Sequence, residues 1–492
     1  MRLFLRKSRV EGGCPVYTRS ENAIVLQRRS HAVGYPVTGY LFTARRNLPH
    51  RCNARRFDRT IPMRGRKPSC RLATADPAAS PRKRCRIIPV DQAQLSTDLA
   101  SRLEARQASL KIVKTTTTPS GQTIDWVPIE SQHPSGKIAT PPPADLARVP
   151  SADSSAHPAA LSRIAKASTF ELDDPRVERG PDGTVPILRP DIARLSQFAG
   201  VQDLHLKRGG LKVNKRRPNR KPTDPDPAGY FHGTDNQNGQ FYGWDGYLNM
   251  WDPSINTPAG GKGTDHSILQ VWLQNYSTGV TQSIEGGWTV DQSLNGDTRP
   301  HVFTYYTTNG YKQDGDNEGG YNTKHKGWMQ YSASVFPGIR INGTSTFGGQ
   351  QFEISMKFQL YQEPNSTDVN WWVSVQGIWM GYYPATLFKT GLAVDVDWAG
   401  SGGEVYSSLS NPEQTQDQMG SGHQASEGWA KAAYLRNLRV QTDMSGTMAE
   451  NNGYGTTDAA SPGGADPYTI SLDMESGSNW DSYFFVGGPT AA

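Results

Sequence analysis

Residues 369–384 read VNWWVSVQGIWMGYYP, and this stretch decides the fold class. It is dense in aromatic and β-branched residues, which are enriched in strands, and these residues alternate with polar ones. Four similar runs, separated by clusters of glycine, asparagine, aspartate and proline, lie at 269–276, 298–308, 326–335 and 351–362. Several short strands at this spacing predict an antiparallel β-sandwich or barrel.

Charge is divided unevenly along the 492 residues. Residues 1–90 hold 21 Lys and Arg against 4 Asp and Glu, a net charge of +17, whereas the whole chain has only +6. Residues 228–492 hold 11 Lys and Arg against 26 Asp and Glu, a net charge of −15. A general nucleic-acid binder is excluded, because the basic excess is confined to a stretch without helical or strand periodicity. We expect residues 1–90 to be a disordered basic leader or the product of a mis-assigned translation start.

The four cysteines, at positions 14, 52, 70 and 85, lie in or next to this leader and lack the paired spacing of a zinc site. No run of 18 apolar residues is present, so a transmembrane helix is not expected. Beyond the leader, leucines among Ala, Gln, Glu and Arg predict an amphipathic helix over 91–112. Residues 183–198 predict an extended piece and then a helix that starts near Asp191. Residues 206–227 are basic and then rich in proline and aspartate, which predicts an exposed linker that is easily cut.

Familiar hydrolase motifs are missing. The sequence contains no HExxH, GxSxG or GxxxxGK[ST], which argues against a zincin, a nucleophile elbow and a phosphate loop. Ser421 and His423 in MGSGH lie two residues apart on a glycine-rich loop and need not face each other, and a triad also needs an orienting acid, so a structural turn is favoured over a serine hydrolase. DGDNEGGYN, at 314–322, begins like a calcium loop, but His325 stands where an EF-hand needs a bidentate glutamate. A hairpin loop is expected there, and neither a metal nor a cofactor is predicted.

Two glutamates interrupt strand-like stretches. Glu285 lies in QSIEGGWTV, at 282–290, and Glu404 lies in WAGSGGEVYSS, at 398–408; each stands beside two glycines. Two carboxylates that face each other on one sheet can share a proton, so that one acts as a general acid and the other as a base. Such a pair hydrolyses peptides or glycosides. By the residues alone, an acidic β-sandwich that binds carbohydrate or peptide through its aromatic side chains remains the alternative.

Eight blocks of the sequence resemble, in order and spacing, the neprosin family of glutamic peptidases. They are QSIEGGWTV, RPHVFTYYTTNGY, FGGQQFEISM, NWWVSV, GYYPATLF, GGEVYSS, QMGSGH and EGWAKAAYLRNL. Upstream, QTIDWVPIESQHPS and GTVPILRPDIARL resemble two blocks of the family's propeptide. The resemblance implies that 91–205 form a propeptide or activation domain, that 206–227 form the exposed linker, and that 228–492 form a catalytic antiparallel β-sandwich.

The resemblance also implies an activity. It suggests a secreted, acid-active glutamic endopeptidase, made as a zymogen, that cleaves peptide bonds next to proline. The implied partners are peptide or protein substrates, proline-rich ones included, and the chain's own propeptide; no nucleic acid or membrane is expected. Glu285 takes the place of the family's first catalytic glutamate and Glu404 that of the second. The alternative is a non-catalytic β-sandwich that binds glycan or peptide, with both glutamates at its rim.

In the mechanism that we expect, the two glutamates hold a water. One of them, as a carboxylate, deprotonates this water for attack on the scissile carbonyl, and the other, kept protonated, donates a proton to the leaving amine. The sequence does not assign the two roles, and Glu285 is favoured as the base over Glu404. The carbonyl oxygen needs hydrogen-bond donors, for which the Gln282 side chain and the backbone amides of Gly286 and Gly287 are candidates.

Three further residues are candidates for substrate contact. Trp288 and Tyr382 are predicted to form a wall of the substrate site. His423, in the QMGSGH block, is a candidate for an additional substrate contact.

Overall fold

The computed structural model describes residues 92–143, 166–195, 229–257, 263–311, 318–409, 416–451, 458–459, 467–474, 480 and 482–489. The chain divides into two units, Met1–Arg84 and Cys85–Ala492, and all the described residues belong to the second. The predicted basic leader, the predicted linker at 206–227 and positions 314–317 of the DGDNEGGYN loop lie outside the described residues.

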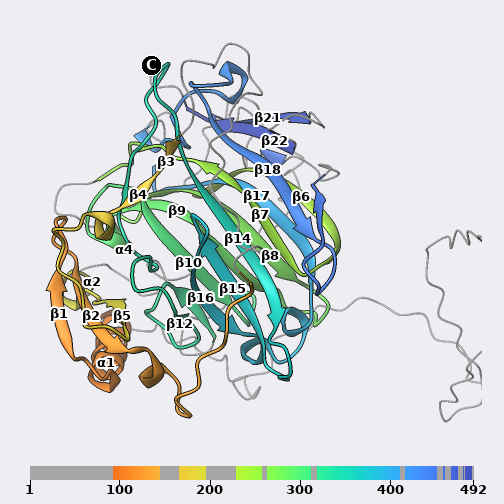
Figure 1. The fold of residues 1–492 in the computed structure, drawn as a ribbon. Helices are drawn as coiled ribbons and strands as arrows, with labels where there is room; N and C mark the ends of the chain where they lie inside the picture. The colour runs from red at the N-terminus through yellow and green to blue at the C-terminus, as the bar shows by residue number, and fades with distance from the viewer. Residues whose placement is uncertain are drawn as a thin grey trace, which may run out of the picture. The chain divides into compact units, whose positions relative to one another are not determined.

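Two large sheets form the body of the described part (Figure 1). Within the described residues, one sheet has seven strands in the order β11-β10-β9-β8-β17-β6-β20. In that order the strands span Gly319–Tyr321, His301–Thr307, Gln282–Asp291, His266–Asn275, Val396–Ser407, Gly229–Phe241 and Asp458–Ala459. Every pairing along this sheet is antiparallel.

The second sheet has ten strands among the described residues, eight of them in the order β12-β16-β15-β14-β7-β18-β22-β21. These eight span Met329–Gln330, Ile378–Pro384, Val369–Val375, Phe352–Gln362, Gly243–Asn249, Ala433–Gln441, Ser482–Gly487 and Thr469–Met474. β19 (Met448–Glu450) pairs with β18, and β3 (Lys166–Ala167) runs parallel to the start of β14.

The core lies between the two sheets. Leu269, Val271 and Leu273 of β8 are fully buried in the same apolar cluster as Ile354, Met356 and Phe358 of β14. This packing follows from the period of two in a strand, because alternate side chains of β8 and β14 face the opposite sheet. The predicted antiparallel β-sandwich is therefore confirmed.

The described residues before 196 form smaller elements. A three-stranded antiparallel sheet consists of β1 (Lys114–Thr117), β2 (Thr123–Pro128) and β5 (Thr184–Leu188). The helices are α1 (Gln92–Ser109), as predicted, and α2 (Ile192–Leu195), whose first turn is capped by Asp191 through a hydrogen bond from the Arg194 amide at 3.0 Å. α1 and α2 pack through a small apolar cluster of Leu99, Leu103 and Leu195.

Short elements complete the fold. β4 (Thr169–Phe170) pairs with β13 (Ile341–Asn342), and α4 (Gln292–Asn295) follows β9 directly. Single 3₁₀ turns span Ile129–Gln132, Glu171–Asp173, Ala385–Phe388, Gly391–Ala393 and Ala425–Glu427. The segment 427–438, whose apolar residues suit a helix or a strand, ends in strand β18. Among the described residues, no helix combines the length and the apolar character needed to cross a membrane.

Candidate active site

Glu285 and Glu404 lie on the same face of the seven-stranded sheet. β8 runs between the strands that carry them: Glu285 on β9 pairs with Trp272, and Glu404 on β17 pairs with Ile268. Paired residues point to the same side of a sheet, and Ile268 and Trp272 are an even number of residues apart. The structure therefore brings both predicted glutamates to one face, which is the face turned away from the sandwich core.

The two glutamates are separated by Gln270. A flat sheet with about 4.8 Å between strands and about 3.3 Å per residue would place their Cα atoms roughly 16 Å apart on the diagonal. Gln270 lies halfway along that diagonal, and its Nε2 donates to Glu404 Oε2 at 3.1 Å. The two carboxyl groups thus share the face with the Gln270 amide between them.

Glycines flank Gln270 on both neighbouring strands, since it pairs with Gly287 of β9 and Gly402 of β17. A Cβ on Gly287 would lie 2.0 Å from the Leu269 carbonyl oxygen, and one on Gly402 would lie 2.1 Å from the Gly233 carbonyl oxygen. Gly402 also has φ of +150°, a conformation that favours glycine. Between the two glutamates, the surface of the sheet therefore has no side chain on either strand next to Gln270.

Hydroxyl groups hold Glu285. Ser283 Oγ donates to its Oε1 at 2.8 Å, and the Tyr311 phenol donates to the same oxygen. Gln274 Nε2 donates in turn to the Tyr311 hydroxyl at 2.8 Å, and its Oε1 accepts from the Tyr276 hydroxyl. Burial, together with the negative charge of Glu285, raises the pKa of Tyr311 well above its usual value, so this phenol stays a donor.

Nitrogen groups surround Glu404. Besides the Gln270 amide, His232 Nε2 lies 3.3 Å from Oε2 and His266 Nε2 lies 3.4 Å from Oε1. His232 is the direct cross-strand partner of Glu404 on β6, and the other ring nitrogen of His266 lies 4.0 Å from Asp291 Oδ2. Within the described residues, no group of three His, Cys, Asp or Glu side chains is arranged to hold a metal ion.

Tyr321 lies within electrostatic reach of both glutamates. Its pKa is raised well above the usual value, chiefly by burial and then by the negative charges of Glu404, Asp291 and Glu285. The ring packs edge-on against Tyr305 at 4.9 Å between centroids. Both glutamates are themselves fully buried, with exposed fractions of 0%. A polypeptide substrate therefore cannot reach either carboxyl group in this form of the chain.

Gln282 and Trp288 do not join the glutamates. Each is separated from Glu285 by an odd number of residues along β9, so each points to the other face. Trp288 is buried in the sandwich core and donates from Nε1 to the Asn249 carbonyl at 3.1 Å. Gln282 donates to the Phe388 carbonyl at 2.9 Å. The structure thus contradicts the predicted substrate wall at Trp288 and the predicted oxyanion contact from Gln282.

The remaining candidates also lie elsewhere. Tyr382 belongs to β16 of the other sheet, where its hydroxyl accepts from the Ala139 amide at 3.1 Å. His423 stacks on Phe347 with 4.0 Å between ring centroids and lies 3.1 Å from Glu427. Its backbone amide donates to Ser421 Oγ at 3.1 Å, as the predicted structural turn requires. Gly286 and Gly287 lie inside β9 and are paired with strands on both sides. They are therefore part of the sheet and do not form a loop that could bind an oxyanion.

Sequence reasoning missed five residues of this face: Gln270, His232, His266, Tyr311 and Tyr321. For Gln270 a signal existed, because a polar residue interrupts the apolar run 268–273 in the same way that Glu285 interrupts its own strand. The others reach the glutamates from neighbouring strands or from a loop, and their position depends on strand order.

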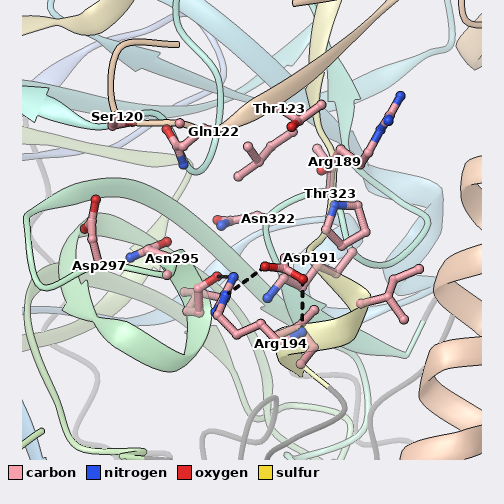
Figure 2. A pocket seen from close by; sticks show the side chains of 18 residues that line it. Ser120, Gln122, Thr123, Arg189, Asp191, Arg194, Asn295, Asp297, Asn322 and Thr323 are labelled. Atoms are coloured by element: carbon pink, nitrogen blue, oxygen red, sulfur yellow. Dashed lines mark hydrogen bonds and ion pairs between the residues drawn. The ribbon is translucent and has the colours of Figure 1, made fainter. Parts of the chain in front are cut away.

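The residues before 196 contact the sandwich next to this face. Arg194 of α2 donates to the carbonyls of Gln292 and Ser293, the first two residues of α4. Figure 2 shows Arg194 and its ion pair with Asp191 at the side of a cavity of about 500 Å³. One wall of the cavity comes from residues 120–123 and 188–195, and the other comes from 294–297 and 322–324. Neither Glu285 nor Glu404 lines it.

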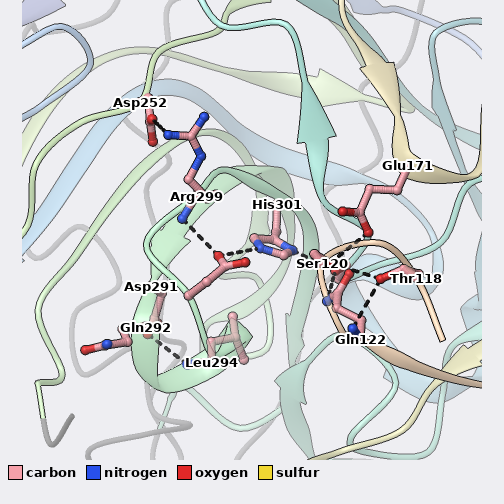
Figure 3. Close-up of polar contacts among 12 residues, drawn as sticks. Thr118, Ser120, Gln122, Glu171, Asp252, Asp291, Gln292, Leu294, Arg299 and His301 are labelled. Atoms are coloured by element: carbon pink, nitrogen blue, oxygen red, sulfur yellow. Dashed lines mark hydrogen bonds and ion pairs between the residues drawn. The ribbon is translucent and has the colours of Figure 1, made fainter. Parts of the chain in front are cut away.

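The Gly338 carbonyl makes a second contact between the residues before 196 and the sandwich. This oxygen accepts from Gln122 Nε2 at 2.9 Å and faces His301 Nδ1 at 2.9 Å, so one acceptor links β10 to the turn before β2. The other ring nitrogen of His301 lies 2.9 Å from Asp297 Oδ1. Figure 3 shows His301 beside Gln122 and Ser120. Together with β3 on β14 and β4 on β13, these contacts dock the N-terminal residues onto the sandwich.

Two comparisons with known proteins give matches. The sequence model of the Neprosin family matches residues 227–489, which is more than half of the chain. Among solved structures, a crystal structure of scytalido-glutamic peptidase with a transition-state analogue inhibitor is similar at 8% sequence identity and a TM-score of 0.28. That similarity covers 52% of this chain and 97% of the other.

Proposed function

Because the chain belongs to the Neprosin family, we propose that it is a glutamic endopeptidase in which Glu285 and Glu404 act together on a peptide bond. Family membership supports a peptidase whose substrates are peptides or proteins. The observation on which the proposal depends is that both glutamates lie on one face of one sheet, each among polar donors, with the glycine-flanked Gln270 between them.

In the proposed mechanism Glu285 is the base. An oxygen that accepts two hydroxyl hydrogen bonds is well suited to negative charge. The Glu285 carboxylate takes a proton from a water, and the water oxygen attacks the carbonyl carbon of the scissile bond. Protonated Glu404 then donates to the leaving nitrogen as the C–N bond breaks, and His232 and His266 are placed to return a proton to it.

Gln270 replaces Gln282 as the proposed oxyanion donor. It lies between the two glutamates, and the glycines on either side leave room for an extended substrate backbone to approach the sheet. A buried amide in this position can donate to the carbonyl oxygen as negative charge develops there. The preference for proline next to the scissile bond is part of the proposal and is supported by family membership alone.

We further propose that 91–205 act as a propeptide and that the cut falls within 206–227. The buried state of both glutamates and the docking contacts of Arg194 and Gln122 support a stored precursor. Titration of the acidic residues below about pH 4 would weaken the precursor and favour release. A peptidase stored in this way is proposed to act after secretion.

The test is an incubation of the purified full-length chain at pH 2.5 to 7 with a proline-containing peptide. Wild type, Glu285→Gln, Glu404→Gln and the double variant are compared by gel and mass spectrometry, and far-UV circular dichroism checks the fold. Acid-dependent loss of about the first 200 residues, with peptide cleavage, is expected for wild type only. An intact chain and an intact peptide at every pH would reject the proposal and favour a non-catalytic binding module.

A further inference from the structure

An aromatic patch lies on the outer face of the ten-stranded sheet, in the layer that does not contain the glutamates. In β15 and β16, Trp371 and Tyr383 point into the sandwich core, whereas Trp372 and Tyr382 point away from it. Trp372 packs against Tyr382 at 4.7 Å and against Trp379 at 6.0 Å between ring centroids. We define the aromatic patch as Tyr331, Tyr361, Trp372, Trp379 and Tyr382.

The segment Lys-Ile-Ala-Thr-Pro-Pro-Pro, at 137–143, covers this patch; Figure 1 shows it as an orange trace that reaches β15. Ala139 and Pro142 are buried, whereas Thr140 and Pro143 are exposed. A burial period of three residues is that of a polyproline II helix, and consecutive prolines favour this conformation.

Two hydrogen bonds hold the backbone of the segment. Tyr382 Oη accepts from the Ala139 amide at 3.1 Å, and Trp379 Nε1 donates to the Pro142 carbonyl at 3.1 Å. At the rim, Lys137 Nζ lies 2.5 Å from Asp368 Oδ2, and Thr140 Oγ1 donates to Glu363 Oε1 at 2.6 Å. Aromatic rings with ring N–H and O–H groups that bond backbone carbonyls and amides are the usual way in which proteins recognise proline-rich peptides.

The aromatic patch also contains a hydrogen-bond donor that the 137–143 segment does not use. Trp372 is fully buried, and its Nε1 has no hydrogen-bond partner among the described residues. A buried donor without a partner is costly, so a ligand that supplied a carbonyl here would gain a hydrogen bond that the 137–143 segment does not make.

We propose that the aromatic patch is a docking surface for a proline-rich, extended segment of a polypeptide substrate. The 137–143 segment occupies it in the precursor, and the substrate takes its place once the N-terminal residues have left; this step rests on the proposed function. The patch and the glutamates lie on different sheets, so the patch takes no part in bond cleavage. Two points of attachment on one long substrate would raise the effective concentration of its scissile bond.

Binding can be tested separately from catalysis. The full chain carries Glu285→Gln and Glu404→Gln in every sample, so that no peptide is cleaved. In the opened chain, Pro141→Gly, Pro142→Ser and Pro143→Gly remove the polyproline conformation from the resident segment. Fluorescence anisotropy then measures the affinity of a labelled KIATPPPA peptide, and a KIATAAAA peptide serves as the control ligand.

The opened chain is expected to bind KIATPPPA at least tenfold more tightly than the chain with the intact segment. Trp379→Phe keeps an aromatic ring, smaller than the indole, but removes the N–H donor, and should weaken binding by about tenfold. Ile378→Ala, at an exposed neighbouring position, should leave binding unchanged, and thermal unfolding confirms that each variant is folded.

Equal binding of both peptides, no binding by the folded opened chain, or no effect of Trp379→Phe would each overturn the proposal. The 137–143 segment would then only stabilise the fold, and the patch would not bind substrate. Because all samples lack both glutamates, these outcomes do not depend on whether the chain is a peptidase. Failure of the acid-processing test with successful peptide binding would reject the proposed function and retain the docking surface.

Discussion

Tyr311→Phe tests how Glu285 is prepared for catalysis. The substitution removes one hydroxyl that donates to Glu285 and keeps the ring that stacks on Tyr305 at 6.0 Å. A hydrogen bond to a charged group contributes about 1.5–3 kcal/mol. If the transition state loses this energy relative to the free enzyme and substrate, kcat/KM falls by roughly 10- to 150-fold. Ser283, which donates to the same oxygen at 2.8 Å, remains and prevents a larger loss.

The assay is cleavage of a fluorogenic proline-containing peptide by the processed protein at pH 2.5 to 7, with urea unfolding as the check on stability. Tyr242→Phe, whose ring packs against the sandwich core, is the control. Unchanged kcat/KM in a stable Tyr311→Phe protein would refute the role given to this hydrogen bond.

Three further predictions concern stability and release. Arg436→Met should lower the free energy of unfolding by about 3–5 kcal/mol in urea titrations, because it leaves the Glu353 carboxylate buried without its charged partner. Adding Glu353→Met should recover most of the lost free energy, and no recovery would contradict the ion-pair explanation. Burial raises the pKa of Asp417 to about 7, so the folded chain keeps a proton that the unfolded chain loses above about pH 4. Stability should therefore fall between pH 4 and 7 by on the order of 3 kcal/mol from this group, and Asp417→Asn should flatten that slope in chemical denaturation. Arg194→Ala removes the hydrogen bonds to the first two carbonyls of α4 and should speed acid release of the N-terminal residues by about tenfold, measured by gel. An unchanged rate would show that this contact does not limit release.

Most of what could be predicted from the sequence came from the two-residue alternation of side chains in strands. The alternation of aromatic and polar residues in VNWWVSVQGIWMGYYP predicted an antiparallel β protein, and the structure places Trp371 in the core and Trp372 outside it. The same period could have excluded Trp288 and Gln282, since both stand an odd number of positions from Glu285. The pairing of the two glutamates was predictable only with strand order, because β8 lies between them.

Other features depend on contacts between distant parts of the chain. Nothing in the sequence near Tyr382 indicates that its partner is Ala139, which lies 243 residues earlier. The segment 427–438 has apolar residues that suit a helix or a strand, and pairing of β18 with β7 and β22 decides the outcome. Tertiary pairing of this kind overrides local preference.

Strand β8 imposes a genetic constraint as well as a structural one. Its even-numbered residues, among them Gln270 and Trp272, face the glutamates, and its odd-numbered residues, among them Leu269 and Val271, face the core. Losing a single codon within this strand would exchange the two sets, exposing leucine and valine beside the carboxylates and burying glutamine in the apolar layer. Deletions and insertions that survive in this gene should therefore fall in the connections on either side of β8, and divergence within the strand should proceed by substitution alone.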